Sequence, residues 1–124
     1  MADRPDWSLF RALSRRVLRD GVPLVLTETV RMLLLRTAHE VAIHDAETAL
    51  STEEGALALM SEAARRITDG SNRLTDALHM MWQHQRVGDY NRARQLMRDV
   101  LAVEVVPYYR VLAQGQLDDM ADEP

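Results

Sequence analysis

Residues 56–81 read ALALMSEAARRITDGSNRLTDALHMM, and their apolar side chains recur at alternating steps of four and three residues. Only an α-helix returns side chains to one face at that spacing. The row stays in phase through Ala56, Met60, Ala63, Ile67, Gly70, Leu74, Ala77 and Met81. The pattern predicts one long helix over about residues 52–86, with this row facing a packing partner.

The stretch Asp69-Gly70-Ser71-Asn72 opposes that prediction locally. Glycine inside a helix costs roughly 1 kcal/mol relative to alanine, and Asp, Ser and Asn prefer caps to helix interiors. Two independent helices would have no reason to share one phase, however. We therefore predict a continuous helix, bent at Gly70. On that basis Gly70→Ala should be neutral or stabilising.

A second apolar row follows the breaker Arg86-Val87-Gly88-Asp89, and Asp89 is its predicted N-cap. The row predicts an arm over about residues 90–117 that returns along the first arm as an antiparallel hairpin. Pro107 removes a helical hydrogen bond, so a kink or brief break is expected at about residues 104–107. The predicted inward side chains are Ala93, Leu96, Met97, Val100, Val103, Pro107, Tyr108, Val111 and Leu112.

Two shorter helices are predicted before the hairpin. Asp6 is a candidate cap for the first, whose apolar face carries Trp7, Phe10, Leu13 and Val17. Thr27 is a candidate cap for the second, which buries Val30, Leu33, Leu34, Ala38 and Val41. Ser51 and Glu54 have capping-box spacing, so the long helix should begin there. Residues 45–50 fit either a short helical turn or a loop.

These elements predict an all-α helical bundle, in which the two amino-terminal helices pack across the long antiparallel hairpin. The 124 residues fit one domain, 1–124, with frayed ends at residues 1–5 and 118–124.

Composition excludes several classes of function. There is no cysteine, which rules out disulfide scaffolds, cysteine-based zinc sites and thiol nucleophiles. The net charge of −4 argues against broad nucleic-acid binding. No apolar run is long enough to cross a bilayer and no signal peptide is recognisable, so we expect a cytoplasmic protein without a membrane partner.

No catalytic, cofactor or metal site emerges from the motifs. His39 and His44 are five residues apart, as are His79 and His84. On a helix this spacing turns the second imidazole about 140° from the first, whereas zinc-binding pairs need i, i+4 spacing. A di-iron site is also excluded, because no histidine follows His84 to supply a second Glu-x-x-His motif. We therefore expect no enzyme, no cofactor and no bound metal.

Two groups of residues are candidates for binding a protein partner. One consists of Trp82, Tyr109 and Arg110, because Trp, Tyr and Arg commonly anchor interfaces, and we expect Trp82 and Tyr109 to make two separate contacts. The same residues also suit a core with an amphipathic boundary. The other is a row of Arg11, Arg15 and Arg19, which fits a partner-binding stripe or an ordinary solvated face. Self-association is left open.

Four segments resemble the DUSAM domain family, a small family of paralogous myxobacterial proteins without an assigned activity. They are Asp6-Trp7, residues 21–27 (GVPLVLT), residues 36–43 (RTAHEVAI) and residues 98–110 (RDVLAVEVVPYYR). Every basic residue other than histidine is Arg, which suits a GC-rich genome. The resemblance implies no catalytic residue.

Two hypotheses about function follow. The first is a non-catalytic protein–protein interaction domain, either an immunity protein or a regulatory adaptor, the immunity role being an analogy with other small paralogous families of such bacteria. The second is a small-molecule-binding helical domain or enzyme, with a pocket where the amino-terminal helices cross the hairpin. A cavity lined by His39, His79 or Tyr108 would favour the second hypothesis.

Overall fold

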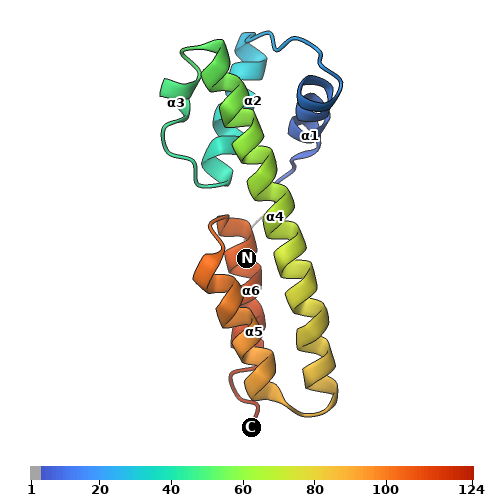
Figure 1. Cartoon of the computed structure of the whole chain (residues 1–124). Coiled ribbons are helices and arrows are strands. Elements are labelled where there is room, and N and C mark those ends of the chain that lie inside the picture. The colour runs from blue at the N-terminus through green and yellow to red at the C-terminus, as the bar shows by residue number, and fades with distance from the viewer. Residues whose placement is uncertain (1–3) are drawn as a thin grey trace. The chain divides into compact units, whose positions relative to one another are not determined.

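The computed structural model describes residues 4–124, and all regular elements in that range are helical (Figure 1). They are α1 (Ser8–Ser14), the π-helical turn η1 (Arg15–Arg19), α2 (Glu28–Glu40), α3 (Ala46–Ala49), α4 (Glu53–Arg86), α5 (Tyr90–Val103) and α6 (Pro107–Asp119). The all-α prediction is therefore confirmed. Contacts group the described chain into two compact units, unit 1 (residues 4–67) and unit 2 (Thr68–Pro124), and α4 contributes to both. A single domain over 1–124 stays a prediction.

The long helix is confirmed as continuous. α4 covers Glu53–Arg86 without a break at Gly70. Seven of the eight predicted stripe residues are buried, and Ala77 is half-buried. The phase of the apolar row therefore predicted the course of this helix better than the local preferences of Asp69, Ser71 and Asn72 did.

The start of α4 differs from the predicted capping box. The Ser51 hydroxyl donates to the Thr48 carbonyl, 2.6 Å away, and so does not cap α4. Thr52 caps it instead, because its Oγ1 accepts the Gly55 N–H at 3.0 Å. The caps of two other helices are confirmed: Thr27 accepts the Val30 N–H, and Asp89 accepts the Arg92 N–H.

Unit 1 contains α1, η1, α2, α3 and the first part of α4. Its buried side chains include Trp7, Phe10, Val17, Leu34, Ala38, Val41, Leu50, Leu59, Met60 and Ala63. Trp7 Nε1 donates to Glu40 Oε1 at 3.2 Å and links the start of α1 to the end of α2. The Ser8 hydroxyl and backbone N–H both donate to Asp6, which lowers the pKa of the Asp6 carboxyl.

The end of α2 is held by an unusual residue. Ala42 has φ of 65°, a left-handed conformation that favours glycine. The Ile43 N–H donates to the Ala38 carbonyl and the Ala42 N–H to the His39 carbonyl, which is the Schellman pattern. Arg66 Nη1 also donates to the carbonyls of Val41 and Ala42, at 2.9 and 3.0 Å.

Arg66 is held in that position by its own helix. Its Nε donates to Glu62 Oε2 at 2.7 Å. Hydrogen bonds from Arg65 and Arg66, of which the one from Arg65 has the larger effect, lower the pKa of the Glu62 carboxyl. These contacts tie the end of α2 to α4.

Unit 2 is built from the second part of α4 together with α5 and α6 (Figure 1). The prediction of one arm over residues 90–117 is wrong, because the chain reverses at residues 104–106 and α6 packs back along α5. Pro107 is the first residue of α6, where its missing N–H costs no hydrogen bond. The expected break at 104–107 is thus a complete reversal.

The reversal resets which side chains face inward. Val103, Pro107, Val111 and Leu112 are exposed, although the unbroken row predicted them to be buried. Tyr109, Ala113 and Met120 are the buried residues of α6 and the segment after it. Four methionines lie in the two cores: Met60 in unit 1, and Met81, Met97 and Met120 in unit 2.

The carboxyl end, where fraying of residues 118–124 is predicted, has defined contacts over residues 118–120. α6 extends to Asp119, and Met120 is buried. Arg94 Nη1 donates to the carbonyls of Met120 and Glu123, at 2.9 and 3.0 Å. At the other end, residues 1–3 lie outside the described residues, and the two that follow, Arg4 and Pro5, have no regular structure.

Candidate functional site

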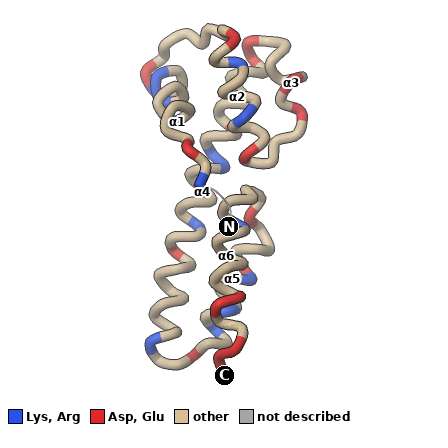
Figure 2. The backbone as a smooth tube through the Cα atoms, turned by 180° about the vertical axis from the view of Figure 1, so that it is seen from behind, with Lys and Arg blue, Asp and Glu red and all other residues tan. Residues whose placement is uncertain are grey.

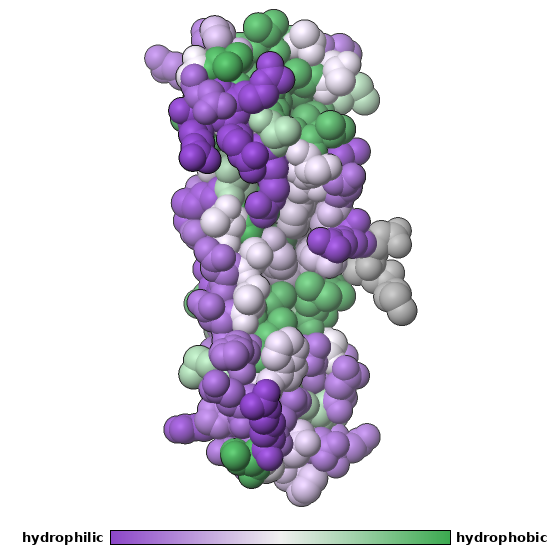
Figure 3. Space-filling model, turned by 90° about the vertical axis from the view of Figure 1, so that its right-hand side faces the viewer, coloured by the Kyte–Doolittle hydropathy of each residue, from purple (hydrophilic) through white to green (hydrophobic). Residues whose placement is uncertain are grey.

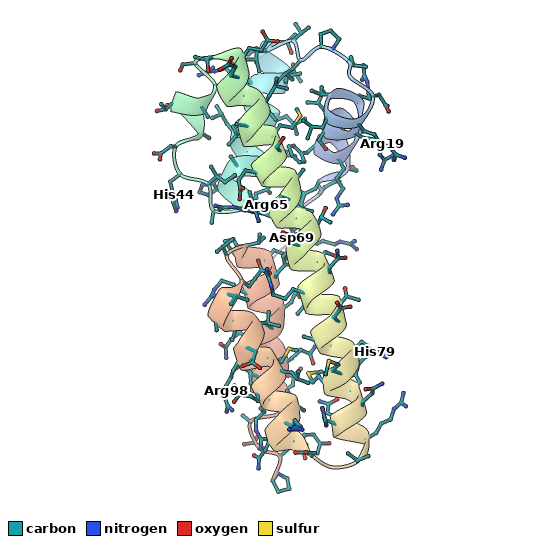
Figure 4. The ribbon with its side chains drawn as sticks, in the orientation of Figure 1. Arg19, His44, Arg65, Asp69, His79 and Arg98 are labelled. Carbon is teal, nitrogen blue, oxygen red and sulfur yellow. The ribbon has the colours of Figure 1, made fainter. Side chains whose placement is uncertain are left out.

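The arginine row of the first helix faces solvent. Arg11, Arg15 and Arg19 are all exposed, and Arg19 points away from the helix (Figure 4). No carboxylate among residues 4–124 forms an ion pair with any of the three. They are therefore charged groups without a described partner.

The row continues through a π-helical turn. In η1 the Asp20 N–H bonds to the Arg15 carbonyl, five residues back, and the Val22 N–H bonds to the Arg16 carbonyl. Such turns are rare and are frequently found at functional sites. They also fix where the next segment begins, because Val22 is tied to η1.

That next segment is an apolar connection, residues 22–26 (VPLVL), between η1 and α2. Val22 is 38% exposed, Val25 66% and Leu26 37%, whereas Leu24 points inward at 9%. Connections on a protein surface are normally polar, and a group of exposed apolar side chains commonly marks an interaction site. Over unit 1, Figure 3 shows apolar surface next to strongly hydrophilic surface. This connection is the strongest candidate for a binding surface among the described residues.

Sequence reasoning did not single out this connection. The signal was present, since five apolar residues lie between the helix-ending Gly21 and the helix-capping Thr27. A connection this short cannot form a core by itself. Each of its apolar side chains therefore either packs against the neighbouring helices or stays exposed to solvent.

Trp82 and Tyr109 differ in exposure. Trp82 is 51% exposed and available to a partner, as predicted for a surface anchor. Tyr109 is only 6% exposed, so its assignment as a partner contact is wrong. A Cβ on Gly70 would lie 2.6 Å from Cε2 of Tyr109, which shows how closely the ring packs on α4.

Arg110 is exposed but has a structural role. Its Nη1 donates to the carbonyls of Leu101 and Glu104, at 2.7 and 2.9 Å. These oxygens lie at the carboxyl end of α5, where helix carbonyls lack intrahelical partners. Arg110 therefore holds the α5–α6 reversal together.

Glu104, which the sequence did not single out, is the centre of that reversal. Its side chain is 1% exposed and pairs with Arg73 Nη1 at 2.7 Å. Its other oxygen, Oε2, accepts the N–H groups of Val105 and Val106 at 3.0 and 2.9 Å. All these contacts lie within unit 2, and the group fixes the start of α6. The available signal was a lone carboxylate in the apolar run Val103-Glu104-Val105-Val106.

A cavity of about 720 Å³ is the second candidate site. Its described lining comes from α4 alone: Thr75, Asp76, Leu78, His79, Met80 and Trp82. All but Leu78 are exposed, so the cavity opens to solvent. His79 contacts Gln83, whose Nε2 lies 3.5 Å from the imidazole Nε2.

The histidines are dispersed. His39, His44 and His79 are exposed, and Figure 4 shows His44 and His79 in different units. Within residues 4–124, no three His, Asp or Glu side chains come close enough to hold a metal ion. In the same range, no helix combines the length and apolar character needed to cross a bilayer.

A family model described as "Protein of unknown function (DUF2379)" matches residues 5–120. No curated protein and no solved structure matches the chain. The description of the family does not carry the name DUSAM.

Proposed function

The chain belongs to the DUF2379 family, whose function is unknown, and we propose that it is a non-catalytic protein–protein interaction domain. The observation that carries the proposal is the exposed apolar connection 22–26, beside arginines without a described partner. Removing apolar surface from water is the main favourable term in most protein association. Arginine adds forked hydrogen bonds to carboxylates.

The finer assignments belong to the same proposal. We propose that the family is the DUSAM family of myxobacteria and that the protein acts in the cytoplasm as an immunity protein or a regulatory adaptor. The analogy with other small paralogous families supports the immunity role. Nucleic acid and membranes are not its partners in this proposal, and the protein is not an enzyme.

The test is capture of partners from the native organism by a tagged, full-length chain, with identification by mass spectrometry. Each captured protein is then purified and titrated against the wild-type chain and the variant Val22→Ser/Val25→Ser/Leu26→Ser. Because truncated interface anchors each cost more than about 1 kcal/mol, the triple variant should bind at least about tenfold more weakly.

The matched control is Val87→Ser/Val103→Ser, which removes two exposed apolar side chains from unit 2. It should bind like the wild type. If both variants bind equally well, the connection is not the interaction surface. A chain that captures no protein at all would contradict the proposal itself.

The cavity beside His79 and Trp82 supports a second candidate, binding of a small apolar molecule. Its described lining is largely apolar in character, with Asp76 and His79 able to orient a ligand. A screen of small metabolites by thermal shift tests this candidate. A ligand that raises the melting temperature of the wild type but not of Trp82→Ala would support it.

A further inference from the structure

We propose that the surface around the apolar connection binds a second copy of this chain, through the outward face of α6. The proposal rests on the function proposed above and names its partner. The basic–apolar face consists of Arg11, Arg15, Arg19 and residues 22–26. The acidic–apolar face consists of Val111, Leu112, Asp118 and Asp119.

The basic–apolar face carries a net positive charge, with Asp20 as the one carboxylate between the arginine row and the connection. Between Ser8 and Arg19 the chain has four arginines and no Asp or Glu. Three of them follow one another at four-residue steps, and all three are exposed. The apolar connection begins directly beyond this row, since the Val22 N–H bonds to the Arg16 carbonyl at 3.0 Å.

The acidic–apolar face has the opposite composition. Val111 is 49% exposed and Leu112 39%, and the exposed Asp118 and Asp119 follow two turns later on the same side of α6. No Arg, Lys or His occurs from Val111 to Pro124, whereas Asp122 and Glu123 extend the negative charge. Figure 2 shows acidic residues concentrated towards the carboxyl end of the chain.

Asp118 remains available for pairing with a cation. Its described hydrogen bond is from Gln114 Nε2, at 2.9 Å, which is a neutral donor. No Arg among the described residues forms an ion pair with Asp118 or Asp119. A guanidinium from another molecule therefore meets a carboxylate with free acceptor positions.

The two faces complement each other in both charge and hydropathy. Apolar side chains meet apolar side chains at the centre, which supplies affinity, and Arg meets Asp at the rim, which sets register and association rate. One chain thus carries both halves of a charge-matched contact.

An anionic bilayer fits the same face less well. The connection 22–26 has no Trp, Tyr or Phe, the residues that anchor proteins at a bilayer interface. The net charge of −4 also opposes the approach of the whole molecule to an anionic surface. The contact joins two different faces of the chain, so it is a head-to-tail contact between two copies.

The test is sedimentation equilibrium of the full chain together with two charge-reversal variants. Arg11→Glu/Arg15→Glu reverses one face, and Asp118→Arg/Asp119→Arg reverses the other. Each variant alone should associate at least about tenfold more weakly than the wild type. An equimolar mixture should form a mixed complex, because the reversed charges are again complementary. Added salt should weaken the wild-type association.

Arg98→Glu and Asp76→Arg are the matched controls, since both residues are exposed but lie on neither face. They should associate like the wild type. Circular dichroism and thermal melting of every variant separate loss of association from loss of fold. If Arg11→Glu/Arg15→Glu is less stable, Arg11→Gln/Arg15→Gln removes the charge without adding repulsion and should still associate more weakly.

A wild-type chain that stays monomeric up to about 1 mM would overturn the proposal. So would unchanged association in either reversed variant, or a mixture of the two that forms no mixed complex. Binding of a monomeric chain to vesicles of phosphatidylglycerol and phosphatidylcholine, lost in Arg11→Glu/Arg15→Glu, would assign the face to a membrane instead. If self-association fails while capture of another protein through 22–26 persists, only this inference fails and the proposed function stands.

Discussion

Two connections in this chain are made in opposite ways. The η1–α2 connection exposes Val22, Val25 and Leu26 and is anchored by Leu24. The α5–α6 reversal at residues 104–106 is short, and Glu104 at its centre is buried and fully bonded. The first leaves apolar surface free for another molecule. The second uses its polar groups to hold its own helices.

The arginines follow the same division. Arg73 and Arg110 donate to groups of the reversal within unit 2. Arg11, Arg15 and Arg19 have no described partner. The same residue type thus serves stability in one place and is available for binding in the other, which composition alone does not reveal. Variants of the two connections should accordingly differ in what they damage.

Glu104→Ala should have the largest effect on stability. It removes a buried ion pair and leaves two backbone N–H groups without their acceptor, so we expect a loss of about 3 kcal/mol in unfolding free energy. Urea denaturation measures this. Glu104→Gln should lose less, because an amide oxygen still accepts both N–H groups. Asp20→Ala, at the η1–α2 connection, should change the free energy of unfolding by less than about 0.5 kcal/mol. A loss equal to that of Glu104→Ala would show that the two connections do not differ in their contribution to stability.

Leu24→Ala should have the next largest effect. Leu24 is the buried anchor of the exposed connection, and truncating a buried leucine costs about 2 kcal/mol or more. Val25→Ala, one residue on, should cost less than about 0.5 kcal/mol, because Val25 is 66% exposed. Both variants are measured by the same denaturation. Equal losses would mean that the connection packs as a unit.

Gly70→Ala should destabilise by about 1 kcal/mol, contrary to the expectation from a continuous helix alone. The added Cβ would lie 2.6 Å from Cε2 of Tyr109 and 2.9 Å from Glu104 Oε1, and such overpacking outweighs the better helix propensity of alanine. Gly115→Ala is the control, because nothing lies within 4 Å of its Cβ position in α6. That variant should raise the melting temperature, and a rise for both would show that the packing at Gly70 relaxes freely.

Ala42→Gly should have the smallest effect, a gain of about 0.5 kcal/mol. Glycine relieves the left-handed backbone at φ of 65°, and the greater entropy of glycine in the unfolded chain offsets part of that relief. Ala102→Gly, at an exposed position inside α5, should instead lose about 1 kcal/mol. Differential scanning calorimetry distinguishes the two signs. A loss for Ala42→Gly would mean that the contacts of Arg66, not the backbone conformation, dominate there.

Sequence predicted what depends on periodicity and local capping. The phase of the apolar row identified α4, and the side chains of Thr27 and Asp89 marked the starts of α2 and α5. These features involve contacts within a few residues along the chain. They can therefore be predicted from the sequence without knowledge of the tertiary structure.

Sequence did not predict features that depend on distant contacts. Pro107 indicated a break, but a kink and a reversal look alike locally, and the direction of α6 depends on Glu104 meeting Arg73, thirty-one residues away. For the same reason, the burial of Tyr109 could not be read from its neighbours. The arginine row was predicted as a candidate site, but its apolar neighbour at 22–26 was not, because the sequence of a connection does not distinguish a buried apolar residue such as Leu24 from an exposed one such as Val25.

The distribution of methionines gives the protein a graded response to oxidants. Met32 and Met80, at 61% and 46% exposure, meet peroxide directly, and their conversion to sulfoxide changes only surface polarity. Met60, Met81, Met97 and Met120 are shielded, so each reacts only when the structure around it opens. A sulfoxide formed there cannot return to an apolar core without a large penalty. Oxidation of these four buried methionines therefore occurs only in transiently opened molecules. It then prevents them from refolding until a reductase converts the sulfoxide back to methionine.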